Sequence, residues 1–368
     1  MRIAFLDLAA ARAEVADELD DAYRTVMDSG RYLFGAQLEA FEREFARFSG
    51  ATDCAAVGSG LDALVFCLRS IGVGPGDEVI VPTNTTVLTW LAVAAVGAVP
   101  VGVEPDDATL TLDPNRLTEA LSARTRAVVP VHLYGRPAAM TRIVPWAREH
   151  GLRVIADAAQ AHGATIDGIP VGAVGDAVAW SFYPSKNLGA FSDGGAVTSN
   201  APELIDHVRR LRNYGSRARD DVVEVGANSR LDELQAAFLR VRLRHLESWN
   251  DRRRVLADRY GRALADLDIV LPPADDASVR SAWHLFVVRV GDRAAVRSAL
   301  AERGIETLVH YPVPPWSHPV FADLHVKEGT LPVAERLANE VLSLPLGPHL
   351  RPEEADDVVA ALRGVAAT

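Results

Sequence analysis

The chain has 368 residues, 49% of them hydrophobic and 24% charged, which is the composition of a globular protein with room for two or three domains. A formal net charge of −11 argues against nonspecific binding to nucleic acid or to an anionic membrane surface. The two cysteines, Cys54 and Cys67, lack zinc-binding spacing, so we interpret them as reduced core thiols and predict no metal site.

Targeting and membrane signals are weak. The N-terminal segment meets an acid at Asp7 before any long apolar run, which predicts no signal peptide. The most apolar stretch, residues 87–103, is interrupted by Gly97 and Pro100 and is too short to cross a bilayer. We therefore expect a cytoplasmic protein.

Short apolar segments alternate with helix-like segments between about residues 41 and 200. Helical periodicity covers residues 41–48 and 61–71, and strands are expected at 54–57, 78–82, 99–103, 127–131, 153–156, 177–181 and 195–198. Several of these strands are apolar on both faces, which is typical of a buried, mostly parallel sheet with helices on both sides.

The pattern changes after about residue 240. A long arginine-rich amphipathic helix is expected over residues 240–260, then a strand over 283–290 and a helix over 294–303. The sequence thus predicts a large α/β domain, residues 1–245, and a smaller C-terminal α+β domain, residues 246–368.

Lys186 and Asp157 each follow a predicted strand. A lysine that forms a Schiff base and an acid that keeps a pyridine nitrogen protonated are what pyridoxal phosphate (PLP) chemistry requires. From the residues alone, Lys186 could equally be a solvated loop lysine, and Asp157 could be the N-cap of a helix. His162, close after Asp157, is interpreted as a structural histidine.

Phosphate-binding candidates lie at two other strand ends. Gly58, Ser59 and Gly60 stand between a strand and a helix, where glycines and free helix amides accommodate an oxyanion. A tight turn with Ser59 as the helix cap is the alternative. Ser181, which precedes Lys186, offers a further hydroxyl.

A last polar segment runs through residues 213–237. Ser229 with Asp232 resembles a capping box that opens a helix, and Asn228 lies in the loop before it. The arginines of this segment could bind a carboxylate or a diphosphate, or they could simply be surface charges.

Taken in order, these motifs resemble the PLP-dependent sugar aminotransferases of the DegT family, which have the aspartate-aminotransferase (fold type I) architecture. The motifs that carry the resemblance are Tyr32–Gly35, Gly58–Gly60, Val131–Gly135, Asp157–Gln160, Ser181–Gly189, Asn213–Ser216, Asn228–Ala237, His310–Pro312 and Leu342–Leu346. They cover essentially the whole chain. Residues 213–217 and 228–241 most resemble the branch that acts on dTDP-3-keto-6-deoxyhexoses.

The resemblance implies a role for each site residue. Lys186 would form the Schiff base and shuttle the proton, Asp157 would pair with the pyridinium, and Gln160 would reach the phenolic oxygen. The phosphate would be held by Gly58, Ser59, Gly60 and Ser181, and by Asn228 of a second subunit, which implies a homodimer with its active site at the subunit interface. The substrates would be a nucleotide-linked ketosugar and L-glutamate, the sugar lying near Tyr183, Asn187, Tyr214 and Tyr311.

Two positions depart from the family pattern. Relatives usually carry an aromatic residue at the place of Thr86, stacked on the cofactor ring. Three explanations stay open: Trp90 or another ring compensates, the cofactor is held less tightly, or the substrate differs. Trp316 stands where relatives often have histidine, and we expect it to reshape the sugar pocket.

Three alternatives stay open on the sequence. A sugar dehydratase of the same family typically has histidine in place of the lysine, so Lys186 counts against it. A 4-ketosugar or cyclitol aminotransferase would differ in the acceptor alone. A non-catalytic PLP-binding regulator would keep the fold without turnover.

Overall fold

The computed structural model describes residues 2–366. Seven strands form the central sheet in the order β1-β9-β8-β5-β4-β2-β3. Their bounds are β1 Asp53–Val57, β2 Glu78–Pro82, β3 Val99–Val103, β4 Thr125–Val128, β5 Arg153–Asp157, β8 Ala177–Ser181 and β9 Gly195–Ser199. Strands β8, β5, β4, β2 and β3 run parallel to one another, and β9 is antiparallel to both β8 and β1. The predicted mostly parallel α/β sheet is confirmed.

Helices cover both faces of this sheet because alternate strand residues point to opposite sides. Phe41, Phe45 and Leu239 pack on one face with strand residues such as Trp180, while Phe66 and Val93 pack on the other. The helices of this part are α1 Leu8–Ala13, α2 Ala16–Ser29, α3 Ala36–Ser49, α4 Gly60–Ser70, α5 Val87–Ala95, α6 Met140–Glu149 and α7 Pro202–Leu211.

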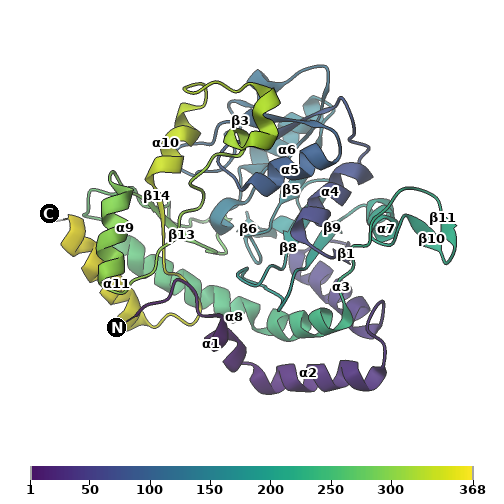
Figure 1. Cartoon of the computed structure of the whole chain (residues 1–368), viewed down its shortest axis with the longest axis horizontal. Coiled ribbons are helices and arrows are strands. Elements are labelled where there is room, and N and C mark those ends of the chain that lie inside the picture. The colour runs from purple at the N-terminus through teal and green to yellow at the C-terminus, as the bar shows by residue number, and fades with distance from the viewer. Residues whose placement is uncertain (1, 367–368) are drawn as a thin grey trace.

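Five short strands form two small sheets outside the central sheet. Strands β6 Thr165–Ile166, β7 Ile169–Pro170 and β12 Val279–Arg280 form a three-stranded sheet, and β10 Ser216–Ala218 with β11 Asp221–Val222 form a hairpin. Figure 1 shows this hairpin projecting from the right edge of the molecule, beyond α7.

The C-terminal part is a smaller α+β unit. Antiparallel β13 Phe286–Arg289 and β14 Val341–Leu344 form its sheet, and α9 Arg293–Glu302, α10 Pro332–Glu340 and α11 Pro352–Ala366 are its helices. Figure 1 shows α9 and α11 at the left, with both chain ends beside them.

The expected boundary between residues 245 and 246 falls inside one continuous helix, α8 Glu233–Ala263. In Figure 1 this helix runs above α2, from below the sheet to the C-terminal unit at the left. Ile3 also joins the C-terminal unit, because it pairs with Ile305 and its amide donates to Gly304 O at 2.9 Å. The first residues of the chain therefore lie with the C-terminal unit and not with the large domain.

Within residues 2–366 we find no helix that combines the length and the apolar character needed to cross a membrane.

A buried ion pair joins α3 to the end of α7. Glu42 accepts from the Arg212 guanidinium and, at 2.8 Å, from Ala56 N of β1, and the exposed fractions of the two side chains are 10% and 7%. Replacing Glu42 with alanine would leave a buried guanidinium without its counterion.

We therefore expect E42A to lower the free energy of unfolding by about 3–5 kcal/mol, measured by urea denaturation. The matched control is E44A on the same helix, whose partner Arg240 is only partly buried, and which should cost about 1 kcal/mol or less. Equal losses in the two variants would contradict this account.

Candidate active site

Two of the predicted site residues end adjacent parallel strands. Asp157 is the last residue of β5 and Ser181 the last of β8, and Asp157 pairs in register with Ala179. The carboxyl ends of parallel strands are where α/β sheets hold ligands. Lys186 follows Ser181 in a turn in which its own amide donates to Tyr183 O at 2.8 Å.

Asp157 is buried, with 3% of its surface exposed. One carboxylate oxygen accepts from Ala159 N at 3.1 Å and the other from Thr89 Oγ1 at 3.0 Å. Burial raises the pKa of Asp157 above its ordinary value, although these two donors and the charge of Lys186 oppose the change. The helix-cap alternative does not apply, because the element that follows Asp157 is the short strand β6 and not a helix.

Burial has the opposite effect on Lys186, lowering the pKa of its amine from 10.5 to about 8, with Asp157 opposing the shift. A lysine with such a pKa is in part a neutral nucleophile near neutral pH. In the described part of the chain no ion pair joins Lys186 to Asp157 or to any other carboxylate. The two groups fit a ligand that brings a cation to the acid and a carbonyl carbon to the amine, as PLP would.

This lowered pKa predicts a pH effect on stability. Between about pH 8 and 10.5 the unfolded chain binds a proton at Lys186 that the folded cofactor-free protein does not, so the free energy of unfolding should rise with pH over this window. The free energy of unfolding of K186M should depend less on pH in this window than that of the wild type, measured by urea denaturation of both proteins without cofactor. Identical slopes would contradict the assignment.

The segment Gly58–Gly60 forms a cradle beside Ser181. Ser59 caps α4 by accepting from Asp62 N at 3.1 Å, and Gly58 N donates to Ser229 Oγ at 2.8 Å. Ser181 Oγ accepts from Tyr183 N, so both Ser59 and Ser181 act as acceptors here and keep their hydroxyl protons for another partner. The first amides of α4 also have no partner inside the helix. The helix-cap interpretation of Ser59 is thus correct, and the cradle still keeps donors for a phosphate.

Gly60 is required by the close packing of this cradle. A Cβ at Gly60 would lie 2.6 Å from Ser181 Cβ. We expect G60A to push α4 away from β8 and to weaken PLP binding at least about tenfold, measured by fluorescence titration of the cofactor-free protein. G74A, where a Cβ meets nothing within 4 Å, should bind PLP normally. Normal affinity in G60A would refute the proposed cradle.

Gln160 belongs to a hydrogen-bonded chain that ends at Thr86. Its amide oxygen accepts from Tyr134 N at 2.6 Å, and its amide nitrogen donates to Tyr311 Oη at 2.9 Å. The Tyr311 hydroxyl also contacts the Thr86 side chain, and burial raises the pKa of Tyr311 to about 12, so it stays protonated. The aromatic ring beside Thr86 is therefore that of Tyr311.

The two tryptophans considered for this region lie in the core. Trp90 is 1% exposed, donates from its indole to Pro82 O at 3.0 Å, and packs against Trp316 and Phe321. Trp316 is itself 8% exposed and belongs to the same apolar cluster. The expectations that Trp90 replaces the stacking ring and that Trp316 reshapes the sugar pocket do not fit these positions.

Asn187 does not lie where a substrate contact was expected. Its amide nitrogen donates to Asn250 Oδ1 at 2.9 Å and to Ala282 O at 2.8 Å, and its oxygen lies 3.1 Å from His284 Nδ1. It is 4% exposed, so its polar atoms are already used inside the protein. The expected capping box is also incorrect, because Asp232 alone caps α8 and Ser229 bonds to Gly58 and Asp62.

The remaining predicted residues are on the surface of the single chain. Tyr183 is 56% exposed and Tyr214 50%, with the Arg230 guanidinium 4.7 Å from the Tyr214 ring centre. Asn228 is exposed and its backbone pairs with Asn213. Within residues 2–366, no hydrogen bond joins Asn228 to the Lys186 site of its own chain.

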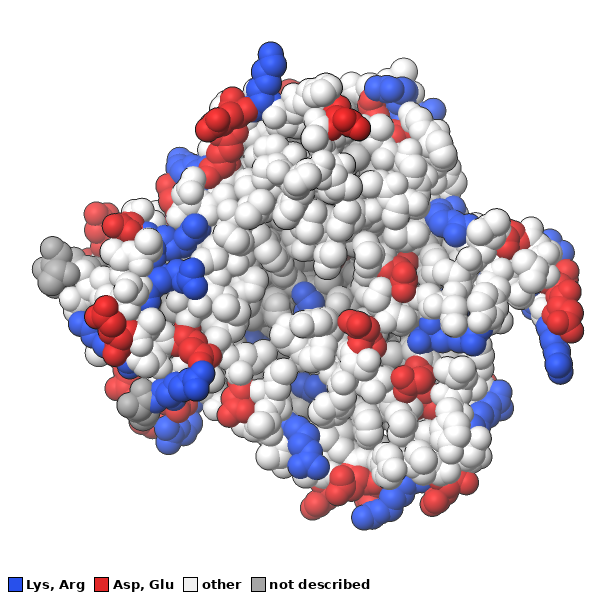
Figure 2. Space-filling model, viewed as in Figure 1, with Lys and Arg blue, Asp and Glu red and all other residues white. Residues whose placement is uncertain are grey.

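The surface near the middle of the molecule is hollowed. Figure 2 shows a hollow at the centre of this face, with basic atoms at its base and mostly uncharged atoms around it. Such a hollow suits an anionic ligand in spite of the overall charge of −11.

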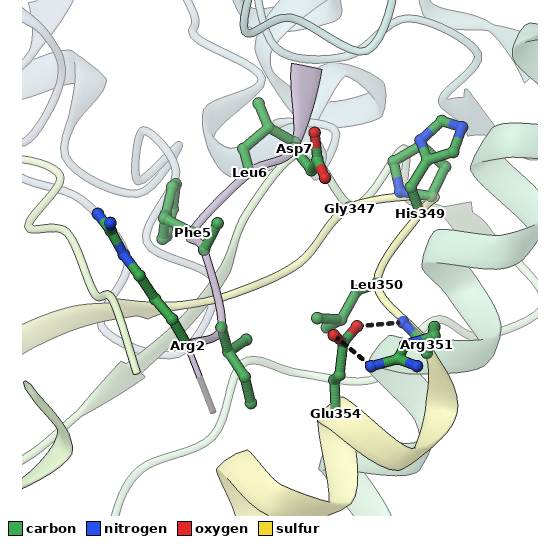
Figure 3. A pocket seen from close by; sticks show the side chains of 12 residues that line it. Arg2, Phe5, Leu6, Asp7, Gly347, His349, Leu350, Arg351 and Glu354 are labelled. Atoms are coloured by element: carbon green, nitrogen blue, oxygen red, sulfur yellow. Dashed lines mark hydrogen bonds and ion pairs between the residues drawn. The ribbon is translucent and has the colours of Figure 1, made fainter. Parts of the chain in front are cut away.

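A separate pocket of about 230 Å³ lies between residues 2–7 and the start of α11 (Figure 3). Its cations already have partners, since Arg2 binds Glu306 and Arg351 binds Glu354. It contains none of the predicted site residues, so the chemistry belongs to the Asp157–Lys186 region and not to this pocket.

Comparison with known proteins decides the family. Residues 13–363 match the DegT/DnrJ/EryC1/StrS aminotransferase family. The chain belongs to this family. A dTDP-3-amino-3,4,6-trideoxy-alpha-D-glucose transaminase from Streptomyces venezuelae is 51% identical over 98% of this chain and 96% of that protein. The erythromycin biosynthesis sensory transduction protein EryC1 of Saccharopolyspora erythraea is 51% identical over 99% of both chains.

Solved structures of DegT/DnrJ/EryC1/StrS aminotransferases share the fold. Streptomyces venezuelae DesV in complex with a ketimine intermediate has a TM-score of 0.98 at 51% identity, covering 100% of this chain and 99% of that one. Bacillus subtilis NtdA with bound PMP has a TM-score of 0.93 at 32% identity, covering 100% and 86%. The fold type I architecture expected from the sequence is confirmed.

Some residues of the site were not found from the sequence. Thr89 lies one helical turn after Thr86, and its hydroxyl in an otherwise apolar helix was the available signal. Tyr134 lies in the Val131–Gly135 motif, but it acts through its backbone amide, which no side-chain pattern indicates. Asn250 and His284 act from distant segments, so no local pattern marked them.

Proposed function

We propose that this chain is a PLP-dependent aminotransferase that moves the amino group of L-glutamate to a nucleotide-linked ketosugar, in particular a dTDP-3-keto-6-deoxyhexose. The observation that carries the proposal is the buried carboxyl of Asp157 at the end of β5, which has no ion pair, together with the half-buried Lys186 five residues after β8, whose amine has a pKa of about 8. The 51% identity to a dTDP-amino-sugar transaminase supports the choice of sugar.

PLP fits the donor groups that the chain provides. Ser59, Gly60 and Ser181 would hold the phosphate, Asp157 the ring nitrogen and Gln160 the phenolic oxygen. When bound, PLP supplies an electron-accepting ring that stabilises negative charge on the carbon next to the transferred nitrogen. Lys186 would be the nucleophile and would move the proton between carbon and nitrogen, because its pKa of about 8 lies near neutrality.

A second copy of this chain would complete the site as a homodimer. Apolar side chains are exposed around Asn228: Tyr214 is 50% exposed, Val222 62% and Val225 82%. A solvated apolar surface of this kind is typical of an interface. Asn228 and its neighbours Tyr214 and Arg230 would then reach the phosphate and sugar bound by the partner, which explains why they lie apart from Lys186 of their own chain.

The alternatives differ in what they require of Lys186. A dehydratase of this family typically has histidine there, so Lys186 counts against it. A regulator remains a second candidate because relatives carry regulatory names: EryC1 is called a sensory transduction protein, and a Geobacillus stearothermophilus protein that is 41% identical is called a pleiotropic regulatory protein. The nucleophilic lysine favours the enzyme, since a regulator needs no amine of lowered pKa.

The acceptor is tested by incubating the protein with PLP, L-glutamate and a panel of dTDP-3-ketosugars, dTDP-4-ketosugars and ketoinositols. Products are identified by mass and NMR. We expect amination of the 3-ketosugar. If only the 4-ketosugar or only the cyclitol is aminated, the proposed acceptor is wrong. If none of these compounds is aminated, the chain is not a sugar aminotransferase.

A further inference from the structure

The turn that carries Lys186 is fixed by one buried amide, that of Asn187. Its nitrogen donates two hydrogen bonds, to Asn250 on α8 and to Ala282 O, and its oxygen faces His284 Nδ1 at 3.1 Å. Asn250 in turn donates to His162 O at 2.8 Å. The Asn187 side chain therefore connects the Lys186 turn to α8 and to the entry of the C-terminal unit, and Asn250 extends this connection to the segment after Asp157.

The hydrogen-bonding capacity of this junction matches its partners. A primary amide has two N–H donors, and both are used. The amide oxygen requires a donor, so His284 must carry its proton on Nδ1. Burial, together with the nearby cations Lys186 and Arg253 and the histidines His310 and His162, lowers the pKa of His284 and keeps it neutral. With every bond satisfied, the amide has one stable orientation.

Helix α8 holds the rest of the same loop. Gln235 Oε1 accepts from Phe191 N at 2.8 Å, and the buried Arg242 donates to Gly189 O at 2.6 Å. Further along the helix, Arg253 donates to Leu346 O at 3.1 Å and, at 3.4 and 3.3 Å, to the carbonyls of Trp283 and His284. Lys186 thus stands at the start of a loop that a single rigid helix positions.

We propose that Asn187 is a positioning residue that sets the place and the desolvation of the Lys186 amine by locking this loop to Asn250, Ala282 and His284. The importance of that amine rests on the proposed function, whereas the effect on the amine itself does not. Loss of the lock would let the turn relax toward water, and the Lys186 pKa would move upward from about 8 toward 10.5.

The chain offers a clean measurement because it has two lysines, Lys186 and the exposed Lys327. Cofactor-free protein is labelled with dinitrofluorobenzene over a pH series, and mass spectrometry of the peptides gives the labelling rate of each lysine. N187L removes all three bonds and should move the Lys186 labelling profile to higher pH. N250A removes one of them, folds more readily, and should move it in the same direction by less.

The matched control is Y260F, which removes a buried hydrogen bond of 2.9 Å from the same helix to Pro345 O. It should lower the melting temperature without moving the Lys186 profile, and Lys327 should be unchanged in every variant. With PLP, glutamate and ketosugar, N187L should lower kcat about 100-fold at nearly constant KM, since a displaced reacting group costs rate more than binding.

The proposal is wrong if N187L and N250A both keep the wild-type Lys186 labelling profile and only their melting temperatures fall. Asn187 would then have a structural role alone. This outcome differs from failure of the proposed function. In that case the wild type would neither bind PLP at Lys186 nor transfer nitrogen, while the labelling profiles, which need no PLP, would still shift.

Discussion

Replacing Lys186 with alanine should abolish amino transfer, by about 10⁴-fold or more, because one amine provides both the nucleophile and the proton carrier. The pKa of this amine is about 8, and its neighbours His162 and His284, whose pKa values are also lowered, provide no second primary amine that could replace it. The measurement is the rate at which 2-oxoglutarate forms from glutamate in the presence of the ketosugar.

The control for this experiment is K327A, the other lysine of the chain, which is exposed and should transfer nitrogen at the wild-type rate. Borohydride reduction of the PLP-loaded wild type should fix the cofactor to the peptide that contains Lys186 and not to that of Lys327. Full activity in K186A, or fixation at Lys327, would refute the assignment.

Replacing Asp157 with asparagine should lower kcat by about 10²–10³-fold while the protein stays folded. Asparagine keeps the size of the side chain and can still accept from Thr89, but it provides no negative charge to pair with a pyridinium. The loss of one preorganised charge in a buried site is of this magnitude. The folded state is checked by urea denaturation.

The neighbouring T89V variant separates charge from hydrogen bonding. It removes the 3.0 Å bond to Asp157 and leaves the charge, so its rate should fall only about tenfold. If D157N retained more activity than T89V, the carboxylate would have no special electrostatic role.

The core strands were predictable because their sequences are apolar on both faces and end at turn residues. All seven strands predicted for the central sheet are present, although β4 ends at Val128 and not at residue 131. Asp157 and Lys186 were identifiable because each comes after the apolar run of such a strand. A buried parallel strand leaves little choice of structure, so local sequence was sufficient there.

Asn187 and the domain boundary were not predictable because they depend on distant partners. Nothing local in Asn187 indicates that Asn250, Ala282 and His284 use its amide. Helix α8 continues through residue 245 because its buried face serves both units in turn, and Ile3 joins Ile305 through a pairing of the two ends of the chain. Such contacts follow from tertiary packing, which overrides local preference.

The most direct test of the account is the absorbance of the PLP-loaded protein on addition of L-glutamate without any sugar. We expect the visible band of the bound cofactor to disappear, with one 2-oxoglutarate released per active site, and the band to return when the ketosugar acceptor is added. An unchanged band, with no 2-oxoglutarate formed, would contradict the central claim that Lys186 and Asp157 carry amino transfer.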